Sequence, residues 1–153
     1  MIAVVDASVA LKWQFEDEET TERAMAMLSD YVENVITLIA PGLFPYEILS
    51  GINVAVNRKR IGQEAGKEAV NYILSLGVQL RTSQDLFVSA FQLAREHGLS
   101  TYDCAYIFLA KKESCDFVTG DKKLYNSCSG KLPMVKWLGD YPFTAAPARN
   151  SKD

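Results

Sequence analysis

Histidine and cysteine are scarce in this chain, with one histidine and three cysteines in 153 residues. A single histidine, His97, excludes a zinc or iron site built from several histidines of one chain. Cys104, Cys115 and Cys128 are widely spaced and form no CxxC pair, which argues against a zinc knuckle or a thioredoxin-like site. Reduced thiols in a cytoplasmic protein are the simplest interpretation of this cysteine usage.

Long apolar runs and an excess of positive charge are also missing. No stretch approaches the roughly 20 apolar residues that a membrane helix requires, so we expect no membrane span. No charged segment precedes the apolar residues 1–5, which argues against a signal peptide. The 16 lysines and arginines against 19 aspartates and glutamates give a net charge of −3. That balance argues against a general basic coat for nucleic acid but leaves room for a local basic rim.

Short apolar runs alternate with longer amphipathic segments, which predicts an α/β fold with a parallel sheet and right-handed crossovers. We expect strands at residues 2–5, 35–40, 78–82, 116–119 and 134–138. We expect helices at residues 8–15, 20–32, 44–58, 62–76, 84–96 and 101–113, and a short helix or turn at 122–126. The length fits a single domain over residues 1–142, followed by a disordered tail at 143–153.

Four carboxylates occupy positions where such a fold gathers ligands. Asp6 and Asp121 directly follow predicted strands, and Glu47 and Asp103 lie near the beginnings of predicted helices. A parallel sheet directs the carboxyl ends of its strands toward one crevice, and acids gathered there repel one another unless a cation joins them. Oxygen ligands alone favour Mg²⁺ or Mn²⁺. The pattern therefore predicts a divalent-metal site in an enzyme.

Each carboxylate also has a purely structural interpretation. Asp6 and Asp121 suit the cap position before a helix, and Asp103 falls three residues after a serine, as in a capping box. Glu47 could lie on a solvated helix edge. The joint occurrence of the four favours a common site. Asp116 begins a predicted strand and should lie at the opposite edge of the sheet, where we assign it a structural or solvent role.

Four segments carry a resemblance to a known family. They read VVDAS with LKW at 4–8 and 11–13, PYEILSG at 45–51, STYDCAY at 100–106 and FVTGDKKL at 117–124. In this order and spacing the sequence resembles the PIN-domain nucleases, and within them the toxins of VapBC-type, or type II, toxin–antitoxin pairs. The resemblance implies a three-layer α/β/α fold with a parallel sheet of about five strands in the order 3-2-1-4-5.

The same resemblance implies roles for individual residues. The acidic pocket, catalytic and metal-binding, would consist of Asp6, Glu47, Asp103 and Asp121. Asp6 and Asp103 would be the most direct metal ligands. Ser8 and Thr119 occupy positions of supporting hydroxyl groups.

The activity that the resemblance implies is an Mg²⁺- or Mn²⁺-dependent endoribonuclease that cleaves single-stranded RNA. Its partners would be RNA, a cognate antitoxin and a second copy of the chain. A stand-alone nuclease of RNA processing fits the residues equally well. A catalytically silent scaffold and a phosphotransfer domain are weaker alternatives, the latter because Ser8 stands where a dehalogenase-like phosphatase has its second acid.

Basic residues must offset the negative pocket if RNA is to approach it. They could equally be solvated helix ends, where cations suit the helix dipole. The candidates for RNA contact are Lys12, Arg58, Lys59, Arg60 and Lys122.

Aromatic and apolar residues near the acids have two interpretations each. Trp13, Tyr46 and Tyr102 could stack on bases, although we expect them to pack in the core. The apolar residues 43–44 and 48–49 could form a groove for an antitoxin helix, but burial in the core explains them as well.

Overall fold

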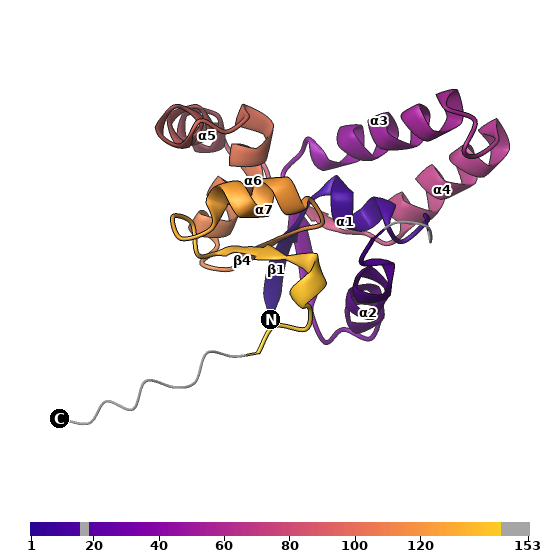
Figure 1. Cartoon of the computed structure of the whole chain (residues 1–153), viewed down its shortest axis with the longest axis horizontal. Coiled ribbons are helices and arrows are strands. Elements are labelled where there is room, and N and C mark those ends of the chain that lie inside the picture. The colour runs from indigo at the N-terminus through magenta and orange to yellow at the C-terminus, as the bar shows by residue number, and fades with distance from the viewer. Residues whose placement is uncertain (16–18, 145–153) are drawn as a thin grey trace.

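A five-stranded parallel sheet forms the centre of the molecule in the computed structural model, which describes residues 1–15 and 19–144 (Figure 1). The strand order is β3-β2-β1-β4-β5, and each neighbouring pair is parallel, as predicted. The strands are β1 (Ile2–Val5), β2 (Thr37–Ala40), β3 (Gln79–Leu80), β4 (Asp116–Thr119) and β5 (Val135–Trp137).

Helices cover the sheet, and most of their bounds fall within two residues of those predicted. α3 and α4 pair and project beside the sheet, away from α5, α6 and α7 (Figure 1). The helices are α1 (Ala7–Leu11), α2 (Thr21–Val32), α3 (Phe44–Asn57), α4 (Gln63–Ser75), α5 (Gln84–His97), α6 (Thr101–Lys112), α7 (Lys122–Cys128) and the 3-10 helix η1 (Leu138–Asp140).

The first predicted helix, at residues 8–15, is too long. α1 ends at Leu11, and the next three amide groups, at residues 12–14, bond to carbonyls three residues back, as in tight turns. These turns direct the Trp13 indole into the core, where its Nε1 donates to the Ala24 carbonyl at 3.1 Å. The tertiary contact therefore ends the helix earlier than the helix-like sequence suggests.

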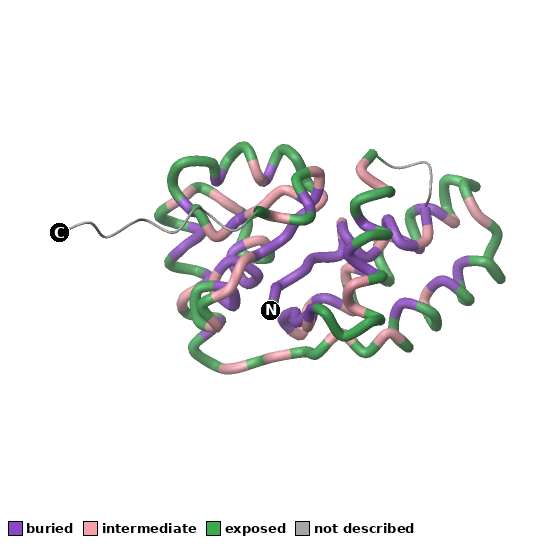
Figure 2. The backbone as a smooth tube through the Cα atoms, turned by 90° about the horizontal axis from the view of Figure 1, so that it is seen from below, coloured by how far each residue is buried: buried purple, intermediate pink, exposed green. Residues whose placement is uncertain are grey.

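The core lies where β1 and β4 run side by side. Val4, Val5, Phe117 and Val118 are completely buried in these two central strands, as expected of strands covered on both faces. Figure 2 shows buried backbone through the middle of the molecule and exposed residues along the outer helices and loops. α6 is buried on most of its surface because it packs against both the central strands and α5.

The predicted disordered tail, residues 143–153, lies only partly within the described residues. In the predicted tail, Phe143 packs edge-on against Tyr141 at a ring distance of 5.5 Å, and residues 145–153 lie outside the described residues.

The cysteines at 104, 115 and 128 are all free, in agreement with the reduced thiols predicted. Within the described ranges, none of the helices combines the length and apolar character needed to cross a membrane.

Two methionines on α2 test how strongly this core packing stabilises the fold. Met27 is completely buried, whereas Met25 is 43% exposed on the same helix. Truncation of a buried methionine to alanine costs about 2–5 kcal/mol. We therefore expect Met27→Ala to lower the free energy of unfolding by that amount in urea titrations, and Met25→Ala to lower it by less than about 1 kcal/mol. Equal effects would contradict the placement of α2.

Candidate active site

The carboxyl ends of β1 and β4 meet at one edge of the sheet. Val5 pairs with Val118 in parallel register, so the residues that follow the two strands lie close together. Asp6 comes directly after β1, and Thr119 ends β4, two residues before Asp121. The sheet order thus brings the two strand-end acids to the same edge, which is also the point where the strand order reverses.

Asp6 is buried and receives hydrogen bonds at both carboxylate oxygens. The Ser8 hydroxyl donates to its Oδ1 at 2.5 Å, and the Thr119 hydroxyl donates to its Oδ2 at 2.6 Å. The backbone amide of Val9 donates to Oδ1 at 3.4 Å. These contacts fix the orientation of the carboxylate. The structure places both predicted supporting hydroxyls on Asp6.

Backbone amides in turn orient the two hydroxyls. The Gly120 amide donates to Ser8 Oγ at 2.8 Å, and the Asp121 amide donates to Thr119 Oγ1 at 3.1 Å. Each hydroxyl therefore accepts from the chain after β4 and donates to the acid after β1. Side chains and backbone of the two strand ends form one hydrogen-bond network.

Glu47 lies in the first turn of α3, half-buried and bonded to a tyrosine. The Tyr106 hydroxyl donates to Glu47 Oε1 at 2.7 Å. Tyr106 itself is buried, and its ring stacks on Phe117 of β4 at 5.5 Å. The sequence alone does not indicate a role for Tyr106, although this residue follows Asp103 by three positions and so shares its face of α6.

Asp103 and Asp121 also serve as structural residues. The Asp103 amide donates to Ser100 Oγ at 3.0 Å, so the predicted cap of α6 is present. The Asp121 carboxylate accepts from the Leu124 amide at 3.0 Å and caps α7. Asp103 is half-buried, and Asp121 is exposed. The structural and the functional interpretations of these acids are compatible.

Burial and mutual repulsion raise the pKa values of three of the acids. Desolvation is the main cause for Asp6, whose pKa rises to about 6, and the Glu47 charge adds to it. Desolvation also raises the pKa of Glu47, with a contribution from Asp103, and the pKa of Asp103, with a contribution from Asp121. The four carboxylates are thus coupled from one to the next, and a cation among them would relieve this repulsion.

The donor set suits a divalent cation in its chemistry. Four carboxylates supply the oxygen ligands that Mg²⁺ and Mn²⁺ prefer. In residues 1–15 and 19–144, no three Asp, Glu, His or Cys side chains are close enough together to hold an ion. The carboxylates would have to move toward one another to share one.

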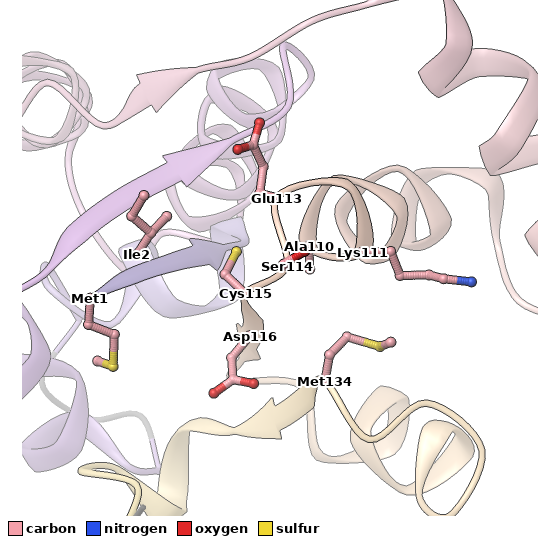
Figure 3. Close-up of a pocket in the computed structure, with 9 residues that line it drawn as sticks. All are labelled: Met1, Ile2, Ala110, Lys111, Glu113, Ser114, Cys115, Asp116 and Met134. Atoms are coloured by element: carbon pink, nitrogen blue, oxygen red, sulfur yellow. The ribbon is translucent and has the colours of Figure 1, made fainter.

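A wide cavity at the opposite edge of the sheet lies away from these acids. It has a volume of about 760 Å³ and is lined by residues that include Met1, Cys115, Asp116 and Met134 (Figure 3). Asp116 begins β4, so it lies at the edge opposite Asp121, as predicted.

The five basic candidates separate into two groups. Lys12, Arg58 and Arg60 line one cavity together with Ser8. Lys59 is exposed and outside that lining, and the Lys122 ammonium lies 3.2 Å from the centre of the Trp137 ring.

The expectation of core packing is correct for Trp13 and wrong for the two tyrosines. Trp13 is buried, but Tyr46 and Tyr102 are 74% and 66% exposed. Both tyrosines immediately precede a pocket acid in the first turn of a helix. Because the acid faces the site, its neighbour is turned toward solvent.

The fold and the acidic sheet edge together define a class of α/β protein with a carboxylate-lined site. The family model of the PIN domain matches residues 3–128. The chain therefore belongs to the PIN domain family.

Curated relatives span nearly the same length. Ribonuclease VapC9 of Mycobacterium tuberculosis is 29% identical over 132 residues, which cover 86% of this chain and 95% of that protein. Ribonuclease VapC3 of Pyrobaculum aerophilum is 30% identical over 129 residues, which cover 81% of this chain and 92% of that protein.

Two solved structures share the fold. The crystal structure of PAE2754 from Pyrobaculum aerophilum matches with a TM-score of 0.63 and 20% identity over 90% of this chain and 92% of that one. The structure of VapBC2 from Rickettsia felis, bound to a DNA fragment from their promoter, matches with a TM-score of 0.62 and 14% identity over 90% and 97%. At these identities the likeness establishes the fold alone.

The raised pKa of Asp6 predicts that its charge destabilises the metal-free protein. A pKa of about 6 in the folded state, against the ordinary 3.8, costs roughly 3 kcal/mol at neutral pH. The raised pKa means that the protonated Asp6 side chain stabilises the folded state. This contribution to the free energy of unfolding is fully present below about pH 4 and is lost as the pH rises through 6. We expect Asp6→Asn to melt several degrees above the wild type at pH 7 in EDTA, with a gain that shrinks toward pH 4.5.

Asp116→Asn is the matched control for this measurement, because Asp116 lies at the opposite sheet edge. Its effect on the melting temperature should not follow the same pH dependence. A metal-free Asp6→Asn variant that melts below the wild type at pH 7 would contradict the description of the pocket.

Proposed function

We propose that this protein is an Mg²⁺- or Mn²⁺-dependent endoribonuclease that cleaves single-stranded RNA, the toxin of a VapBC-type pair. The observation that carries the proposal is the buried Asp6 carboxylate, which the hydroxyls of Ser8 and Thr119 orient and which is coupled to Glu47 and, through it, to two further acids. The names of the curated relatives, ribonucleases VapC9 and VapC3, support the RNA substrate and the toxin class.

Each of the four acids would have its own role in phosphodiester hydrolysis. Asp6 and Asp103 would hold the metal most directly, and Glu47, fixed by Tyr106, would complete the set. When bound, the metal supplies Lewis-acid polarisation of the scissile phosphate and lowers the pKa of a water molecule. Asp121, which is exposed, or Glu47 would orient the attacking water. The products would carry a 5′-phosphate and a 3′-hydroxyl.

The surface beside the acids suits unpaired bases. Tyr46 and Tyr102 are exposed and directly precede Glu47 and Asp103 in the chain. Bases of single-stranded RNA stack on such aromatic rings with little regard to sequence. The two tyrosines therefore favour single-stranded RNA over a duplex, whose bases are already stacked.

A homodimer would use the apolar outer face of α5. Phe87, Val88 and Phe91 are each at least 60% exposed there. An apolar cavity of about 270 Å³ between α3 and α5 includes Leu43 and Phe87 in its lining. Several large apolar side chains exposed on one helix are typical of an interaction site. The second copy is the proposed occupant.

An antitoxin is the other proposed partner, and the VapBC2 complex of Rickettsia felis is the structural neighbour that supports it. The sequence suggested residues 43–44 and 48–49 as its groove. Phe44 and Ile48 are buried in the core and are unavailable to a partner, whereas Leu43 and Leu49 remain accessible. The alternative of core burial therefore holds for Phe44 and Ile48, and Leu43 and Leu49 could still contact an antitoxin.

Cleavage of end-labelled single-stranded RNA tests the activity. We expect cutting by the wild type with Mg²⁺ or Mn²⁺ and none in EDTA. Removal of a group that hydrogen-bonds a metal ligand typically costs about 10–100-fold, so Thr119→Val should fall in that range. Asp6→Asn and Asp103→Asn, which remove ligands, should lose more than about a hundredfold. Asp116→Asn should retain activity, and cutting that survives both EDTA and Asp6→Asn would refute the mechanism.

Light scattering after size-exclusion chromatography tests the homodimer. Val88 and Val32 are 62% and 60% exposed on different helices and form a matched pair. A buried charge at an apolar interface is costly, so Val88→Asp and Phe91→Asp should convert a wild-type dimer to monomer, while Val32→Asp should leave it intact. A monomeric wild type, or a dimer indifferent to both α5 changes, would exclude this interface.

A further inference from the structure

A second, smaller cavity adjoins the acidic pocket between α1 and α3. Its volume is about 220 Å³. One part of its lining is apolar, and the polar part consists of Ser8, Lys12, Arg58, Arg60 and Gly120. Three of the five basic candidates thus meet in one concave space, in a protein with a net charge of −3.

Ser8 lines this cavity and also contacts the acidic pocket. Its hydroxyl donates to Asp6 on one side and accepts from the Gly120 amide on the other. Gly120 lets the lysine approach: a Cβ at this position would lie 2.8 Å from Lys12 Cε and 3.1 Å from the Ser8 carbonyl oxygen. The absence of a side chain at Gly120 therefore leaves room for the Lys12 side chain beside the strand end that carries the acids.

The Lys12 ammonium is buried and bonds to a backbone carbonyl. Lys12 is only 9% exposed, and its Nζ donates to the Glu19 carbonyl at 2.5 Å. In the part of the chain that the structure describes, no carboxylate forms an ion pair with it. A buried cation is costly unless an anion compensates it. A solvated helix end, the alternative suggested by the sequence, would leave this group in water.

The two arginines complete a cationic lining. Arg58 follows the last residue of α3 and is exposed at the mouth of the cavity. The Arg60 guanidinium carbon lies 5.2 Å from the centre of the Phe15 ring and also lines the cavity. The Lys12 ammonium combined with the exposed Arg58 guanidinium is a donor set that binds phosphate oxygens.

We propose that this cavity binds one phosphate of the RNA strand, adjacent to the scissile phosphate at the carboxylates. The inference rests on the proposed ribonuclease function and assigns that function a specific subsite. The volume is below the roughly 300–1,000 Å³ of sites for drug-sized ligands, and it suits a single phosphate group. Binding there fixes the strand's register along the acidic pocket and offsets the repulsion between RNA and the carboxylates.

Kinetics of RNA cleavage as a function of salt concentration tests the subsite. Charge-assisted hydrogen bonds of this kind contribute about 1.5–3 kcal/mol, so Lys12→Met and Arg58→Gln should each raise KM about tenfold or more. kcat should change far less. The slope of log affinity against log salt should fall by about 0.7 for each phosphate of a single strand that a variant no longer neutralises.

Two further lysines supply comparisons. Lys67 is exposed on α4 away from both sites, so Lys67→Gln should leave KM unchanged. Lys59 neighbours Arg58 but does not line the cavity. A general basic rim would make Lys59→Gln as damaging as Arg58→Gln, and that result would overturn the subsite. Arg58 is exposed, so its variant folds even if Lys12→Met does not.

Binding of inorganic phosphate separates this inference from the proposed activity. In ¹⁵N-labelled wild type, phosphate should shift the amide signals of Gly120 and its neighbours, and Lys12→Met should abolish the shift. That result supports the anion site whether or not the protein cleaves the RNA tested. Cleavage by the wild type, combined with unchanged KM and salt slope in both variants and no phosphate-induced shift, overturns the subsite and leaves the ribonuclease intact.

Discussion

The hydrogen bonds that hold the buried Asp6 carboxylate between two hydroxyls are the interactions on which the rest of the site depends. They join the chain after β1 to the chain after β4, so they exist only because these strands are neighbours in parallel register. Without them, burial of a carboxylate close to other acids would be far more costly, because each hydrogen bond favours the charged form. Desolvation nevertheless dominates and leaves the pKa raised. The site is therefore held in an electrostatically unfavourable state that a cation would relieve.

Much of the architecture was accessible from the sequence. Short, largely apolar segments identified most of the strands, and a weak alternation at residues 78–82 identified the third. The alternation of these segments with amphipathic ones identified the parallel fold. The strand order came from the resemblance to PIN-domain nucleases, because local periodicity carries no information on which strands pair. The length of the first helix was wrong for a related reason. Trp13 continues a helical pattern, but its indole bonds to Ala24 on another helix, and a contact between helices cannot be read from local sequence.

The site was predictable where it depends on strand ends and unpredictable where it depends on neighbouring elements. Acids that follow strands were placed correctly at one edge, and the Tyr106 bond to Glu47 was not foreseen because it joins α6 to α3. The same limit applies to the basic residues. Five looked alike as helix-end cations, and only packing of α1 on α3 distinguishes Lys12, Arg58 and Arg60 from Lys59 and Lys122. Exposure of Tyr46 and Tyr102 also follows from which face of each helix its acid occupies.

Asp6 and Asp121 each hold the first turn of a short helix, since their carboxylates accept from the Val9 and Leu124 amides. A change in the position of either carboxylate therefore reaches the backbone without passing through any other side chain. Fraying of α1 and α7 is governed by the same oxygens that define the pocket, so the rate at which these two amides exchange with solvent is tied to the state of the site. Hydrogen exchange at the Val9 and Leu124 amides would therefore change when a ligand binds to the carboxylates at this sheet edge.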